Sequence, residues 1–314
     1  MPSWCLYKPY LQNVHRLTIR SRAIDKRMSI EEFEKLAFDT SMRMNDIITR
    51  DVMSIEWHWR QSGHEVWFLE TEKLIEILNK SNFNVDISLI PNMDHPVVVS
   101  LPGKDGEKNG GFMMYKSTVG LRRKRLEKFY RSMGFNFNMT FYSDEEDIND
   151  DTEIIEVSAH DKSGQTRFRF IVPDTKMDCA LKGTFWDDPD TFKQSLLPME
   201  SIDCDYERQL FQLASRLLVY IKVFPEVMTS GYPRPKSIHG GYFDKKKSKS
   251  RLIGIPEKMK NSPESHYRTW HFRTLRDKRY AAGGELPRMV FVSDTIVGKI
   301  TPKTVRESKS LTLQ

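Results

Sequence analysis

The fold of this chain is decided by one long amphipathic stretch, YERQLFQLASRLLVYIKV at residues 206–223. Its apolar residues recur at the three- and four-residue spacing that predicts a helix; they are Leu210, Leu213, Ala214, Leu217, Leu218 and Ile221. This apolar face is wide enough to indicate burial on most sides, so we expect it to be the central helix of the main domain. Pro225 is expected to end it, because proline cannot continue a helix without losing a hydrogen bond.

Weaker patterns predict the elements around this helix. Helical spacing predicts helices at residues 30–49, 65–80 and 121–133, and Ser29 with Glu32 has the pattern of a capping box. Apolar runs and alternation predict strands at residues 97–102, 112–115, 135–142, 154–157 and 166–172, the last two as an antiparallel pair. An aromatic strand and turn is predicted at residues 57–64, a turn and helix start at 187–190, and an irregular lead-in over the first 28 residues.

These predicted helices and strands are interspersed without a regular βαβ rhythm, which favours the α+β class. A loop rich in glycine and proline follows Pro225 and is the best candidate for a domain boundary. We therefore expect an α+β main domain at residues 1–228 and a small, basic, β-rich C-terminal module at residues 229–314.

Composition excludes several classes of protein. No window approaches the roughly 20 consecutive apolar residues that a bilayer span needs, and the first residues lack the pattern of a secretory signal. The three cysteines, Cys5, Cys179 and Cys204, are too widely spaced for a zinc motif or a disulfide framework. We expect a soluble, cytoplasmic protein with reduced cysteines and no contact with membranes.

Charge is distributed unevenly along the chain. Residues 232–280 hold fourteen Lys and Arg against four Asp and Glu, a net charge of +10, although the whole chain carries only +6. The opposite pole is at residues 144–156, which hold eight acidic residues and no basic one. This asymmetry indicates either an anionic partner for the basic segment or attraction between the two segments within the fold.

The most informative part of the basic segment is residues 265–276, SHYRTWHFRTLR. In an extended strand each face would mix aromatic rings with cations, and such a surface can stack on bases and neutralise phosphates. The candidate nucleic-acid contacts here are Tyr267, Arg268, Trp270, Arg273 and Arg276, with Phe272 as a further ring. The alternative is a strand whose rings are packed in a core, with arginines stacked on them at its rim.

Two further basic runs are candidates. Lys245, Lys246, Lys247, Lys249 and Arg251 would form a loop that follows phosphates without reading sequence, or a solvated charge run. Arg122 and Arg123 open the helix predicted at 121–133. Positive charge there opposes the helix dipole, so local stability does not explain it. A second phosphate-binding stripe and a solvated helix face both fit this run.

Motifs of known catalytic or cofactor sites are missing. The acidic run lacks the spacing of an EF-hand, His58 and His64 lack metal-ligand spacing, and residues 103–111 do not form a phosphate loop. His266 and His271 would lie on opposite faces of a strand, which argues against an acid–base pair. We therefore expect no metal and no cofactor, and no enzyme class is indicated.

The C-terminal strands resemble a motif of uncharacterised proteins from phages and mobile elements. There a strand rich in histidine and arginine is followed by a turn and a strand with an aromatic–valine run and Val-Gly. The matching residues here are His266, Arg268, His271, Arg273, Val290, Phe291, Val292, Val297 and Gly298, and the 97–102 strand followed by Gly111-Phe112 is also similar. Trp270 departs from the pattern, which has glycine there. The resemblance implies a mobile-element context and no assigned activity.

Together these features predict an accessory protein of the phage or mobile-element type. It would bind nucleic acid, DNA or RNA, or a nucleoprotein complex through the C-terminal module. One alternative is a protein–protein modulator or inhibitor of a host or defence complex, favoured by the acidic run and the missing catalytic motifs. A second alternative is a nuclease, which would need clustered carboxylates or a histidine pair.

Overall fold

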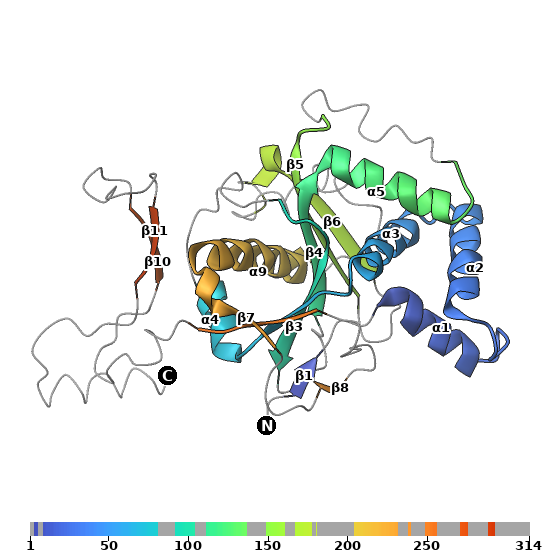
Figure 1. Cartoon of the computed structure of the whole chain (residues 1–314), viewed down its shortest axis with the longest axis horizontal. Coiled ribbons are helices and arrows are strands. Elements are labelled where there is room, and N and C mark those ends of the chain that lie inside the picture. Colours follow the sequence, from blue (N-terminus) through green and yellow to red (C-terminus); the bar gives the residue numbers. More distant parts are fainter. Residues whose placement is uncertain are drawn as a thin grey trace, which may run out of the picture.

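A computed structural model places a mixed β-sheet between two layers of helices (Figure 1). It describes residues 3–5, 9–80, 92–103, 111–136, 149–160, 167–177, 180, 204–231, 238–239, 249–255, 271–275 and 288–292. Within these residues helices and both parallel and antiparallel strand pairs occur, which confirms the α+β class expected from the sequence.

The sheet has the strand order β6-β5-β4-β3-β2-β9-β7, and β1 and β8 join it beside β3. β2 lies between β3 and β9 and runs parallel to both, whereas the other neighbours along this order are antiparallel. The strands are β1 (Ser3–Cys5), β2 (Val66–Leu69), β3 (Val97–Gly103), β4 (Gly111–Thr118), β5 (Glu153–His160), β6 (Arg167–Pro173), β7 (Met228–Ser230), β8 (Ile238–His239) and β9 (Ser250–Ile253).

Helices cover both faces of the sheet. Figure 1 shows α4 and α9 on one side, and α1, α2, α3 and α5 on the other. The helices are α1 (Tyr10–Arg20), α2 (Ile30–Arg43), α3 (Ile47–Gln61), α4 (Glu72–Lys80), α5 (Val119–Ser132) and α9 (Cys204–Val223), with single 3-10 turns at η2 (Asp174–Lys176) and η3 (Pro225–Val227). The helix predicted at 206–223 and its end before Pro225 are confirmed by α9 and η3.

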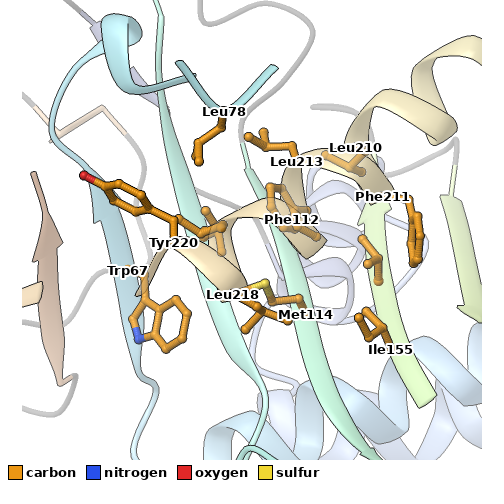
Figure 2. Packing of buried hydrophobic residues seen from close by; sticks show 14 of the residues in the cluster. Trp67, Leu78, Phe112, Met114, Ile155, Leu210, Phe211, Leu213, Leu218 and Tyr220 are labelled. Carbon is orange, nitrogen blue, oxygen red and sulfur yellow. The ribbon is translucent and has the colours of Figure 1, made fainter. Parts of the chain in front are cut away.

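The largest hydrophobic core lies between α9 and the sheet. Figure 2 shows side chains of α9 and α4 facing those of β2, β4 and β5; the labelled residues are Trp67, Leu78, Phe112, Met114, Ile155, Leu210, Phe211, Leu213, Leu218 and Tyr220. The Tyr220 hydroxyl also donates a hydrogen bond of 2.8 Å to the Gly254 carbonyl, at the end of β9. One helix therefore covers the centre of the sheet and holds β9, the strand of this sheet that comes last in the sequence.

The opposite face of the sheet packs against α3. Because side chains alternate along a strand, Val66, Phe68 and Val98 point away from α9 and meet Ile55 and Trp59 of α3. A third cluster joins the outer helices, where the Phe38 ring of α2 makes edge-on contacts with Phe129 and Tyr130 of α5. The helical layer on this face of the sheet therefore contains two hydrophobic clusters, one against the sheet and one between the helices.

Several local signals in the sequence act as predicted. The Ser29 hydroxyl accepts a hydrogen bond from the Glu32 N–H, and the Glu32 carboxylate accepts one from the Ser29 N–H, which confirms the capping box. Gly134 follows α5 with φ of +89°, a conformation that glycine adopts without steric cost. The strand pair predicted at 154–157 and 166–172 is the antiparallel pair β5–β6.

The segment between α2 and β2 differs from the prediction. The helix predicted at 30–49 is interrupted, since Asn45 has φ of +53° and Asp46 caps a new helix by accepting a hydrogen bond from the Thr49 N–H. Residues 57–59, predicted as a strand, lie in that helix, α3, because the buried Val52, Ile55 and Trp59 repeat at helical spacing.

Two further elements were missed because tertiary contacts form them. The helix predicted at 65–80 begins instead with β2, whose four buried residues are typical of an interior parallel strand. The lead-in predicted as irregular contains α1. The buried carboxylate of Glu56 accepts hydrogen bonds from the Tyr10 N–H, at 2.6 Å, and the Leu11 N–H, at 3.4 Å, so a residue of α3 stabilises the first turn of α1.

The sheet continues past the predicted domain boundary at residue 228. β7 spans that residue, and β9 lies between β2 and β7, so residues up to Ile253 belong to the main sheet. β10 (His271–Leu275) and β11 (Arg288–Val292) form an antiparallel sheet of their own. The division of the chain into two domains stays a prediction. The strand predicted at 135–142, from residue 137 on, and the helix start predicted at 187–190 lie outside the described residues.

Replacing Leu217 of α9 tests the core. This side chain is fully buried against the sheet, so we expect Leu217→Ala to lower the free energy of unfolding by about 2–5 kcal/mol, measured by urea denaturation. Gln209→Ala on the exposed side of α9 is the control and should change it by less than about 0.5 kcal/mol. Equal midpoints for the two variants would contradict the central place of α9.

Candidate functional site

The basic run that opens α5 divides between the interior and the surface. Arg122 is 4% exposed, and one of its terminal nitrogens, Nη2, lies 2.9 Å from both carboxylate oxygens of Asp51 in α3. Arg123 is exposed and pairs with Asp150 just before β5. Arg122 was expected to contact phosphate, but in this structure its guanidinium is enclosed by the fold and neutralised by a carboxylate.

A second arginine of α5 has the same role. The two terminal nitrogens of Arg125 each lie 2.7 Å from one oxygen of the buried Glu156 in β5, and Arg122 Nε lies 3.5 Å from that carboxylate. Such a bidentate arginine–carboxylate pair is among the strongest polar contacts in proteins. Asp51, Arg122, Glu156 and Arg125 thus form an alternating row of buried charges. This row explains positive charge early in α5 that the helix dipole does not favour.

The acidic run is used by the same part of the molecule. Three of its four acidic residues in the described part form ion pairs: Asp150 with Arg123, Glu153 with Lys116 at 2.7 Å between Oε1 and Nζ, and Glu156 with Arg125. These partners belong to β4 and α5. Most of the described acidic run therefore neutralises α5 and β4; residues 144–148 lie outside the described part.

Next to this row of charges lies a polar group that we call the Tyr115 centre, made of His58, Tyr115 and Arg125. The Tyr115 ring of β4 is 5.7 Å from the His58 ring of α3, edge to face, and 5.5 Å from the Arg125 guanidinium carbon. His58 Nδ1 and Arg125 Nε are buried and have no hydrogen-bond partner among the described residues. Buried polar atoms normally have partners, and these two belong to a small set of exceptions among the described residues.

Burial is the main influence on the titration of His58. Burial first, and then the charge of Arg125, lower its pKa to about 4; Glu156 opposes this effect, and His95 and Lys128 add to it. Burial also raises the pKa of the Tyr115 hydroxyl. Both side chains are therefore neutral near pH 7. The sequence analysis treated His58 as a packed or surface residue. The centre could have been found from polar residues at positions where helical spacing predicts burial, such as Asp51, Ser54 and His58 on α3.

A second polar group surrounds Glu65 at the amino ends of the parallel strands. The Glu65 carboxylate accepts a hydrogen bond of 2.8 Å from Trp67 Nε1, lies 3.1 Å from His95 Nε2, and is 3.6 Å from Arg251 Nε in β9. Burial alone would raise the pKa of Glu65, but hydrogen bonds from Trp67 and His95 and the charges of His95 and Arg251 together lower it. Glu65 thus fixes the position of Arg251, one of the predicted contacts.

Two basic residues of the C-terminal segment reach the surface at this place. The Arg251 side chain is 41% exposed despite its contact with Glu65. Lys249 is exposed, and its backbone is bonded to the turn before β2: its N–H donates to the Gly63 carbonyl at 3.3 Å, and its carbonyl accepts from the Val66 N–H at 2.9 Å. Lys249 and Arg251 therefore lie at the amino end of β2, near His64 and His95.

The aromatic strand is described in part. Residues 271–275 form β10, which pairs with β11 so that Phe272 is opposite Phe291 and Arg273 is opposite Val290. A strand was predicted over this part of the 265–276 stretch, and the pairing confirms it. The other predicted contacts of the C-terminal segment lie outside the described residues; they are Lys245, Lys246, Lys247, Tyr267, Arg268, Trp270 and Arg276.

The helices in the described part of the chain are each too short or too polar to cross a bilayer. The His, Cys, Asp and Glu side chains of this part form no group of three or more that could hold a metal ion. Comparison of the chain with protein-family models, with curated proteins and with solved structures finds no match.

The buried pair of Arg125 and Glu156 can be tested by removing one partner. We expect Arg125→Ala to lower the free energy of unfolding by roughly 3–5 kcal/mol in urea denaturation, because the buried Glu156 carboxylate loses both of its hydrogen bonds from Arg125. The matched control is Arg123→Ala, which removes an exposed ion pair of the same helix and should cost about 1 kcal/mol or less. Equal losses in the two variants would show that burial of the pair has no energetic weight.

His58 predicts a pH dependence of stability. Its folded pKa of about 4 is below the unfolded value of about 6.5, so between these values the unfolded chain takes up a proton that the folded protein does not. Stability should fall as the pH decreases from 7.5 to 5, and His58→Gln should make this fall smaller. Urea denaturation of both proteins at the two pH values measures the difference. An identical fall in the variant would contradict a neutral, buried His58.

Proposed function

We propose that this protein binds nucleic acid, or a nucleoprotein complex, through its basic segment at residues 232–280. Its role would be that of an accessory protein of the phage or mobile-element type. The proposal begins from the net charge of +10 in that segment, on a chain whose remaining residues sum to about −4. A charge excess of this size favours a polyanionic partner, because each neutralised phosphate releases condensed counterions.

One observation carries the proposal: the two basic parts of the chain differ in what neutralises them. In α5, Arg122, Arg123 and Arg125 all pair with carboxylates of the fold. In the C-terminal segment, Lys249 is exposed and Arg251 keeps 41% of its side chain exposed beside a single carboxylate. Three of the four described acidic residues of the 144–156 run pair within the main domain, which supports a partner from outside for the basic segment.

The chemistry of the segment fits binding with little sequence specificity. Lysines and arginines at Lys245–Lys247, Lys249 and Arg251 would hold the phosphate backbone, which fixes position without reading bases. Tyr267, Trp270 and Phe272 would add a surface for stacking on unpaired bases, a contact that every base can make. We therefore expect single strands to bind at least as tightly as duplexes.

A salt series with a lysine variant tests this function. We expect single-stranded and duplex DNA and RNA to bind at low salt, with affinity falling as salt rises. The Lys245→Ala, Lys246→Ala, Lys247→Ala triple variant should reduce the slope of log affinity against log salt by about 2–3, because three phosphate contacts are lost. Fluorescence anisotropy with labelled oligonucleotides measures both.

The control removes three lysines that lie elsewhere. Lys26, Lys35 and Lys73 are exposed in the main domain, so replacing them with alanine changes the net charge equally and should leave the slope nearly unchanged. Absence of binding at low salt, or the same loss of slope in both triple variants, would contradict binding through the C-terminal segment. A protein that is still retained from host lysate after nuclease treatment would point instead to a protein partner.

A further inference from the structure

The antiparallel pair of β10 and β11 has two faces of different chemistry, and the register of the pair determines them. Phe272 is opposite Phe291, and Arg273 is opposite Val290. Successive residues of a strand lie on opposite faces, whereas residues directly opposite each other share a face. One face, which we call the basic face, therefore holds His271, Arg273, Leu275, Arg288, Val290 and Val292; the other, the apolar face, holds Phe272, Thr274, Met289 and Phe291.

Both arginines of this strand pair lie on the basic face. Arg273 is opposite Val290 and Leu275 is opposite Arg288, so Arg273 and Arg288 are diagonal neighbours, about 7–8 Å apart. His271 lies on the same face, two residues before Arg273. Neither strand contains an acidic residue, so this row of cations has no carboxylate within the pair.

The two faces differ in what it would cost to cover them. A sheet of two strands, as this one is within the described residues, is marginally stable in water unless one face packs against something else. Covering the apolar face encloses two phenylalanines and a methionine, which is favourable. Covering the basic face would take two guanidinium groups out of water without a carboxylate from either strand, which is costly. Packing of the apolar face is therefore favoured, and it leaves the basic face open to a partner.

We propose that the basic face binds the phosphate backbone of nucleic acid, with Arg273 and Arg288 as its main contacts. This inference rests on the proposed function and extends it, because Arg288 lies beyond the basic segment at residues 232–280. Guanidinium groups bind phosphate oxygens through paired hydrogen bonds, and two of them on one face can hold the same strand. His271 adds a further donor to the row.

Phe272 and Phe291, opposite each other on the apolar face, have a packing role in this arrangement. Aromatic pairs of this kind stabilise a sheet. A nucleic-acid strand on the basic face does not reach them, so stacking on bases is left to Tyr267 and Trp270. In the competing arrangement the phenylalanines stack on bases, and a variant of Phe272 separates the two.

Replacing Arg288 in the whole protein tests the basic face. Binding of a labelled single-stranded oligothymidylate is followed by fluorescence anisotropy over a salt series. Arg288→Ala should weaken binding at low salt and reduce the slope of log affinity against log salt by about 0.7, the value for one phosphate contact on a single strand. Arg288→Lys keeps the charge and should keep the slope. Arg43→Ala removes an exposed arginine at the end of α2 and should behave as the wild type.

Phe272→Leu separates packing from stacking. With a packing role, either binding is unchanged, or the strand pair is weakened and both the affinity and the salt slope fall, because the arginines lose their common face. A lower affinity with an unchanged slope would mean that the ring stacks on bases, and would overturn the assignment of the two faces.

The variants also distinguish failure of this inference from failure of the proposed function. Suppose that the wild type binds and that the Lys245→Ala, Lys246→Ala, Lys247→Ala variant loses slope. Equal slopes in Arg288→Ala and Arg43→Ala would then overturn the basic face alone. The same loss of slope in Arg288→Lys as in Arg288→Ala would mean that Arg288 does not act through its charge, and would overturn its contact with phosphate. Absence of binding by the wild type would overturn both.

Discussion

Glu156 is fully buried in the middle of β5, and an ionised carboxylate in that position requires positive charge beside it. α5 meets this requirement with Arg125 and Arg122, and Arg122 in turn requires Asp51 of α3. One carboxylate is therefore linked through ion pairs to two of the helices on this face of the sheet. Replacing such a row with apolar residues often costs no stability, so its value here is in geometry. It fixes the rotation of α5, and with it which lysines of that helix reach the surface.

The same row changes how the charge pattern of the chain is understood. Taken as a sequence, Arg122, Arg123, Lys124 and Arg125 form one basic run and Asp144 to Glu156 form one acidic run. In the structure the helical period sends Arg122 and Arg125 inward and leaves Arg123 and Lys124 outside. The acidic run, which leads into β5, supplies the carboxylates that pair with Arg123 and Arg125. Linear charge counts therefore overstate the free charge of the main domain, and the excess at residues 232–280 becomes more pronounced by comparison.

An element could be predicted from the sequence when the interaction that determines it joins residues close together in the chain. α9, the Ser29 capping box, the stop at Gly134 and the β5–β6 pair depend on residues close together in the chain, and all were predictable. α1 was not, because the carboxylate that caps it belongs to Glu56. β2 was not, because four apolar residues fit a buried helix as well as an interior strand. The Tyr115 centre was not predicted because its members come from α3, β4 and α5, and no short sequence pattern contains two of them.

The position of β9 has a consequence for how the protein is made. β2 is an interior strand, yet the neighbour on one of its edges is β9, at residues 250–253. Until that part of the chain leaves the ribosome, β2 exposes an unpaired edge of apolar residues, and Tyr220 lacks the Gly254 carbonyl to which it bonds. Strand pairs between such distant segments form slowly, and an unpaired strand edge can pair with another chain. The period before residues 250–253 are available is therefore the one in which this edge is most exposed to pairing with other chains.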